Sequence, residues 1–141
     1  MTGTDPLGRL VGKYVYSASN AFKIDKWHNL FLTKSHHPIN ITQEAYMELF
    51  DLAGEWFLHV NKVDPEYRYP QFAWDVLPKA GASQIQPHIY ATLTRYRYYG
   101  GLQTIHNAAQ IYIQDTGRNY FTDLVEIHTA LYIKVQLQLL T

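Results

Sequence analysis

The stretch GASQIQPHIYATL, Gly81–Leu93, joins a turn of small residues to a strand that carries one histidine. Gly81, Ala82 and Ser83 have little side-chain bulk, so a ligand can approach the backbone N–H groups and the serine hydroxyl of this turn. The residues that follow Pro87 are mostly apolar, aromatic or β-branched, which favours a strand. Because proline cannot donate a ladder hydrogen bond, we expect Pro87 at an edge or an irregular position.

Strand periodicity places His88 among polar side chains. In a strand over 84–94, alternate residues share a face, so Gln86, His88 and Tyr90 would point to one side. Ile85 and Ile89 would point to the other side, into the core. The pattern leaves two interpretations open: His88 is a reactive group presented by the turn and strand, or an ordinary polar residue of a half-buried strand.

Three further segments read as strands, at 13–25, 26–35 and 69–78. The segment 26–35 holds the apolar run Leu30-Phe31-Leu32, which is typical of a buried strand. Because the strands at 69–78 and 84–94 are separated by a tight turn, we expect them to pair antiparallel.

Three helices are predicted. Apolar residues recur at three- and four-residue spacing over 41–61, where Asn40 is the predicted N-cap. Helical patterns also cover 102–114, ending near Gly117, and 120–132. The ending VQLQLLT has no stop signal and reads as cut off, and the stretch YIKVQLQLL fits a strand, a helix end or a dimer edge. Strands, helix, strands and helices in this order indicate an α+β fold with an antiparallel sheet.

Composition narrows the function classes. Hydrophobic residues make up 47% of the chain and aromatic residues 15%, which indicates a globular protein. The formal net charge is zero, so no overall field draws the chain to nucleic acid or to an anionic membrane. The sequence has no cysteine, which excludes disulfides and thiolate chemistry. No signal peptide or membrane-spanning run is visible, and we expect a soluble, cytoplasmic protein. The histidines lack metal-ligand spacing, so we expect no metal. We also expect no cofactor.

The opening stretch resembles the active-site segment of the histidine triad superfamily, and within it the galactose-1-phosphate uridylyltransferase branch. That branch carries a Gly-x-Ser turn followed three residues later by His-Pro-His. The matching residues are Gly81, Ser83, Pro87 and His88. His88 falls on the nucleophilic histidine. The first histidine of the motif is replaced by Gln86, and the later polar position is Tyr90.

The resemblance extends upstream of the turn and covers about residues 13–95. Superfamily members carry an asparagine six residues before the turn glycine, where this chain has Asp75. They also carry a strand that ends in basic residues and histidine, and FLTKSHHPI keeps Lys34 and His36 of that element. His36 is therefore the candidate for the outer histidine of the site, with His37 as the alternative.

The resemblance implies nucleotidyl transfer. His88 would attack the α-phosphate of a nucleotide-sugar or dinucleotide and form a covalent nucleotidyl-histidine. A sugar phosphate, phosphate or water would then accept the nucleotide. The backbone carbonyl of Gln86 would keep the other ring nitrogen protonated, while Ser83 and the turn amides would stabilise charge on the phosphate.

The implied site has two parts. The catalytic set is His88, Ser83, Gln86 and His36. The substrate-binding set is Asp75, Gly81, Ala82, Gln84, Tyr90, Lys34 and Lys79. The expected fold is a single histidine-triad-like domain over 1–141, with about five antiparallel strands, one long helix packed on them and a C-terminal helical region at 102–141. Its partners would be a nucleotide or nucleotide-sugar and either a second copy or a missing second module.

Two alternatives to a full enzyme stay open. The changes at Asp75, Gln86 and Tyr90 also fit a catalytically weakened module that binds nucleotide or phosphate, or that pairs with a partner domain. The ending also fits a fragment whose missing C-terminal part completes the site.

Overall fold

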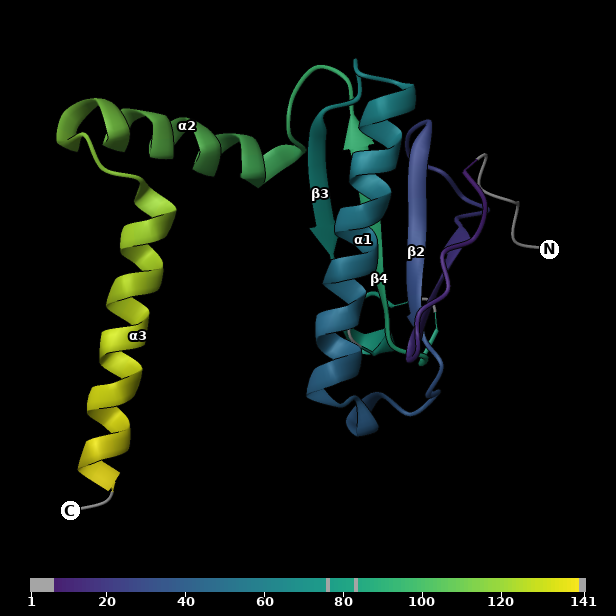
Figure 1. Cartoon of the computed structure of the whole chain (residues 1–141), viewed down its shortest axis with the longest axis horizontal. Coiled ribbons are helices and arrows are strands. Elements are labelled where there is room, and N and C mark those ends of the chain that lie inside the picture. Colours follow the sequence, from purple (N-terminus) through teal and green to yellow (C-terminus); the bar gives the residue numbers. More distant parts are fainter. Residues whose placement is uncertain (1–6, 76, 83, 140–141) are drawn as a thin grey trace. The chain divides into compact units, whose positions relative to one another are not determined.

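The computed structural model describes residues 7–75, 77–82 and 84–139 (Figure 1). The chain divides into two compact units, Met1–Tyr98 and Tyr99–Thr141. The first unit is a sheet covered by one long helix, and the second is a pair of helices.

The sheet unit contains a four-stranded antiparallel sheet in the order β1-β2-β4-β3. Its strands are β1 (Val15–Ser19), β2 (Trp27–Thr33), β3 (Tyr69–Ala73) and β4 (His88–Thr94). Strands β3 and β4 pair antiparallel as predicted, but residues 74–87 connect them instead of the expected tight turn. The α+β prediction is confirmed, but the described residues form four strands rather than about five. The described part of the ambiguous C-terminal stretch belongs to a helix that ends at Leu139, so it adds no strand.

The fourth strand begins later than its sequence predicts. It starts at His88 because Pro87 has no N–H to donate; instead its carbonyl accepts from the Thr33 N–H at 3.1 Å. The alternation therefore does not reach back to Ile85, which is 59% exposed, while Ile89 is buried. The prediction that Ile85 faces the core is wrong.

The helix α1 (Gln43–Val63) packs along one face of the sheet (Figure 1). Its N-cap is Thr42, whose hydroxyl accepts from the Ala45 N–H at 3.2 Å. The predicted cap Asn40 instead ends a one-turn helix, Pro38–Asn40, that begins at the proline. Trp56 lies at the centre of the core, with edge-to-face contacts to Trp27 and Phe31 at centroid distances of 6.4 and 6.3 Å. The buried core cluster is Val15, Trp27, Phe31, Leu49, Ala53, Trp56, Val60, Ile89, Ala91 and Leu93.

Glu48 of α1 fixes the segment that leads into β1. Its carboxylate accepts three backbone N–H groups, from Lys13 at 2.9 Å, Tyr14 at 2.6 Å and Val15 at 2.7 Å. The same carboxylate lies 2.5 Å from the position that a Cβ at Gly12 would take, so a side chain there would displace it. One carboxylate thus joins the helix to the first strand.

The helical unit consists of α2 (Gly100–Thr116) and α3 (Tyr120–Leu139). Gly117 ends α2 in the left-handed region with φ 72°, which agrees with the predicted stop. The buried carboxylate of Asp123 binds the Arg118 guanidinium at 2.7 Å and the Tyr112 hydroxyl at 2.7 Å. Several large apolar side chains of this unit are exposed, namely Ile105, Ile111, Phe121, Val125, Ile127, Leu131 and Tyr132. Within the described part of the chain, no helix combines the length and apolar character needed to cross a bilayer.

Candidate functional site

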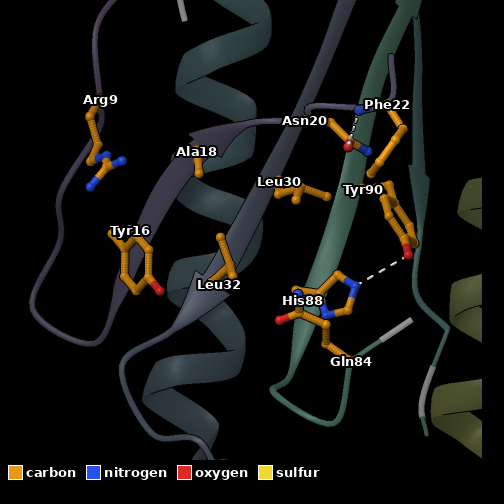
Figure 2. Close-up of a pocket in the computed structure, with 10 residues that line it drawn as sticks. All are labelled: Arg9, Tyr16, Ala18, Asn20, Phe22, Leu30, Leu32, Gln84, His88 and Tyr90. Carbon is orange, nitrogen blue, oxygen red and sulfur yellow. Dashed lines mark hydrogen bonds between the residues drawn. The ribbon is translucent and has the colours of Figure 1, made fainter. Parts of the chain in front are cut away.

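The face of the sheet opposite α1 carries a pocket of about 500 Å³ (Figure 2). Alternate residues of three strands reach this face: Tyr16 and Ala18 from β1, Leu30 and Leu32 from β2, and His88 and Tyr90 from β4. The complete lining is Arg9, Tyr16, Ala18, Asn20, Phe22, Leu30, Leu32, Gln84, His88 and Tyr90. The pocket thus has an apolar floor with polar groups at its edges.

His88 stands at the wall of this pocket with one defined tautomer. The residue is 5% exposed, and its Nδ1 lies 2.7 Å from the backbone carbonyl oxygen of Gln86. A carbonyl oxygen only accepts, so Nδ1 carries the proton of the neutral ring and Nε2 keeps its lone pair. The Tyr90 hydroxyl, 3.2 Å away, donates to Nε2. The Gln86 carbonyl therefore lies where the resemblance implies.

The side chain of Gln86 forms hydrogen bonds with other residues than its backbone carbonyl does. Its amide donates to the Thr33 carbonyl oxygen at 2.6 Å and approaches the Tyr16 hydroxyl at 3.4 Å. These bonds tie the end of β2 to the segment that precedes β4. Exchange of the motif histidine for Gln86 thus leaves the carbonyl that orients His88 in place.

The small-residue turn forms its own hydrogen bonds. Gly81 adopts φ 103°, and its N–H donates to the Pro78 carbonyl at 3.1 Å. The Ala82 N–H donates to the Leu77 carbonyl at 3.2 Å. Both amides expected to bind phosphate therefore have acceptors within the turn. Ser83 lies outside the described residues.

Asp75 lies beside this turn. Its carboxylate is 3.8 Å from the position that a Cβ at Gly81 would take. A side chain at Gly81 would meet it in ordinary contact, so the positive φ, rather than crowding, favours glycine there. Asp75 thus neighbours the turn glycine in space.

The basic residues and outer histidines of the predicted site lie elsewhere. Lys34 is exposed, and its ammonium donates to the Gly12 carbonyl at 2.7 Å. His36 and Lys79 are exposed, and His37 accepts from the Ile39 N–H at 3.3 Å. Of the predicted site residues in the described segments, His88, Tyr90 and Gln84 line the pocket. Lys34, His36, His37 and Lys79 do not, and neither do Gln86, Asp75, Gly81 and Ala82.

Sequence reasoning missed several lining residues. The alternation of Tyr16 and Ala18 against core residues was a usable signal, but it needed the pairing of β1 with β2. Arg9 gave no such signal. It reaches the pocket because the chain before β1 folds back, with the Leu10 N–H donating to the Ser17 hydroxyl at 2.9 Å. The Arg9 guanidinium then lies 5.9 Å from the Tyr16 ring centroid.

A second cavity of about 200 Å³ lies on the other side of Tyr90. Its lining is Ile24, His28, Gln71, Ala73, Tyr90 and Thr92. Burial, with the nearby charge of Lys23, lowers the pKa of His28, so its ring is neutral near neutral pH. In the described segments, no three histidine or acidic side chains gather in a way that would hold a metal ion.

Solved structures share this fold, among them two proteins from C. elegans and Plasmodium falciparum. The NitFhit protein of C. elegans has a TM-score of 0.56 and 17% identity, over 61% of this chain and 21% of that one, so the chain spans about a fifth of its length. The Plasmodium falciparum diadenosine triphosphate hydrolase, solved with Cyclomarin A, has a TM-score of 0.56 and 17% identity, over 76% of each chain. No family model and no curated protein matches the sequence. The likeness confirms the predicted histidine-triad-like fold.

Proposed function

We propose that this protein binds a nucleotide and transfers its nucleotidyl group through a covalent intermediate on His88. The observation that carries the proposal is the 2.7 Å bond from His88 Nδ1 to the Gln86 carbonyl, which leaves the Nε2 lone pair at the pocket wall. Neutral imidazole is a nucleophile, and the ring leaves readily in the second step. Fold and orientation of the histidine together favour this chemistry over a purely structural role.

The reaction would proceed in two displacements. Nε2 attacks the α-phosphorus, forming an N–P bond while the P–O bond to the leaving phosphate or sugar phosphate breaks. An acceptor oxygen then attacks the same phosphorus, the N–P bond breaks, and His88 returns to its neutral form. A sugar phosphate or water that accepts the nucleotide loses its proton to solvent.

The larger pocket suits a nucleotide. Its volume of about 500 Å³ lies within the range of roughly 300–1,000 Å³ of small-molecule sites. Leu30 and Leu32 offer an apolar floor for a base, and the exposed guanidinium of Arg9 offers a charge for phosphate. A nucleotide-sugar or a dinucleoside polyphosphate would place its phosphates near His88. The second class includes the substrate named for the Plasmodium hydrolase of similar fold.

The wider proposal concerns the assembly. We infer a single domain over 1–141 that acts in the cytoplasm, either as a homodimer or with a second module, because the uridylyltransferase branch is built from two such modules. Light scattering on the purified chain would measure its mass in solution. A monomer that remains active would contradict the need for a second module.

The covalent intermediate gives the direct test. The protein is incubated with α-³²P-labelled nucleoside triphosphates, nucleotide-sugars and dinucleoside polyphosphates, then quenched in base. We expect a protein-bound label that is stable in base, labile in acid and absent from His88→Ala. His59→Gln, a histidine substitution on α1, is the matched control and should label like the parent chain. A folded protein that takes no label from any of these nucleotides would refute the catalytic proposal.

A second candidate is a module that binds nucleotide or phosphate without turnover. It is favoured because the Gly81 and Ala82 N–H groups, bound to Pro78 and Leu77, are not available to stabilise charge that develops during transfer. The apolar floor of the pocket and the Arg9 guanidinium could still bind a nucleotide. Calorimetric titration would separate the two candidates. Equal nucleotide affinity in the parent chain and His88→Gln, with no turnover in either, would favour the binding module.

A further inference from the structure

The Tyr90 hydroxyl is a hydrogen-bond partner of His88 Nε2, the ring nitrogen whose lone pair would attack a substrate. It is 3.2 Å from Nε2, and the two rings meet edge to face at a centroid distance of 5.1 Å and an angle of 84° (Figure 2). Tyr90 follows His88 by two residues on the same strand face. We propose that Tyr90 caps the nucleophile: its phenol engages the Nε2 lone pair and lowers the reactivity of His88 until a substrate displaces it.

The direction of this hydrogen bond follows from the first one. Because the Gln86 carbonyl holds the proton on Nδ1, Nε2 of the neutral ring has only a lone pair to offer. The phenol must therefore donate, and the electrons it engages are those that would form the N–P bond. The hydrogen bond from Tyr90 must therefore break before Nε2 can attack a substrate.

The strand neighbours of Tyr90 leave room for it to move. Tyr90 pairs with Leu30 on one side and with Ala73 on the other. Ala73 is small, and it lines the cavity of about 200 Å³ behind the Tyr90 ring. Among the described residues, Tyr90 lines both this cavity and the larger pocket. Rotation of its ring toward Ala73 would uncover Nε2 without opening the sheet.

The cap can be tested without a nucleotide. Diethyl pyrocarbonate reacts with neutral imidazole: the ring nitrogen forms an N–C bond to a carbonyl carbon and expels ethyl carbonate, which decays to ethanol and carbon dioxide. The rate at His88 is read by mass spectrometry of its own peptide, at a pH high enough for the rate to have reached its plateau. We expect Tyr90→Phe, which keeps the ring and loses the hydroxyl, to react about two- to tenfold faster, the value of one net hydrogen bond.

The matched control is Tyr69→Phe, a hydroxyl deletion on the same sheet face at the far end of β3. It should leave the His88 rate unchanged. Equal or slower reaction of His88 in a folded Tyr90→Phe would overturn the proposal. The parent chain supplies an independent readout, because a long-range ¹H–¹⁵N spectrum reports which nitrogen of His88 is protonated. A proton on Nε2 of the neutral ring would also overturn the cap.

The displacement of the Tyr90 hydroxyl by a substrate rests on the proposed function. The hydrogen bond from Tyr90 and its effect on the reactivity of His88 do not. Faster carbethoxylation of Tyr90→Phe with no nucleotide label would uphold the cap and refute the transfer reaction. A nucleotide label on His88, with an unchanged carbethoxylation rate in Tyr90→Phe, would uphold the transfer reaction and refute the cap. The two failures are therefore distinguishable in the same pair of proteins.

Discussion

At the scale of single residues, His28 is a buried base whose protonation opposes folding. It is 4% exposed, and burial together with the charge of Lys23 lowers its pKa. The unfolded chain has the ordinary histidine pKa of about 6.5 and so binds the proton first as the pH falls. The contribution of neutral His28 to the free energy of unfolding is fully present above pH about 6.5. It is lost as the pH falls from there toward the lower pKa of His28 in the folded state.

We therefore expect the free energy of unfolding to be lower at pH 5.5 than at pH 7.5, and expect His28→Gln to remove part of that difference. Urea unfolding at the two pH values measures both. His59→Gln, on the helix, serves as the control and should keep the full difference. An unchanged pH dependence in His28→Gln would assign the effect to other groups.

Between elements, the carboxylate of Glu48 links α1 to the chain before β1. Burial works against its ionisation, but the N–H groups of Tyr14, Lys13 and Val15 and the charge of Lys34 outweigh burial and lower its pKa. A carboxyl with a lowered pKa stabilises the fold above its unfolded-state value of about 4.5, and this contribution is lost as the pH falls through the folded-state pKa.

Glu48→Ala should destabilise the sheet unit by about 2 kcal/mol, because three backbone donors lose a charged acceptor at a partly solvated site. Chemical denaturation near neutral pH measures the change. Glu55→Ala, an exposed glutamate of the same helix, is the control and should change stability little. A loss no larger than that of the control would mean that water replaces the carboxylate without cost.

At the scale of the whole molecule, the buried core cluster lies entirely between Val15 and Leu93. Residues 1–98 should therefore fold without the helical unit, because they bring their complete core with them. Thermal unfolding of this fragment should be cooperative, with a midpoint within a few degrees of the full chain. A fragment without a cooperative transition would show instead that the sheet unit needs residues 99–141 in order to fold.

Local patterns in the sequence predicted the features that depend on neighbours in the chain. The apolar spacing of α1, the stop at Gly117 and the polar face of His88 and Tyr90 are of this kind. The features missed depend on pairing between distant segments. Ile85 is exposed because the Pro87 carbonyl meets Thr33, and Arg9 reaches the pocket because the chain folds back on β1. The histidine-triad resemblance predicted the Gln86 carbonyl contact, but not the bond from Tyr90 to Nε2.

The positions of the aromatic residues in the core have an optical consequence. The chain has three tryptophans, and all of them, Trp27, Trp56 and Trp74, lie in the sheet unit. The edge-to-face contact of Trp27 with Trp56 should give this unit a near-ultraviolet circular dichroism signal that vanishes when its core opens. Helices α2 and α3, with 17 and 20 residues against 21 in α1, should instead supply most of the helical signal in the far ultraviolet. A variant that changes the far-ultraviolet signal and leaves tryptophan fluorescence unchanged therefore disturbs the helical unit. A variant that unfolds the sheet unit changes both signals, because α1 belongs to that unit.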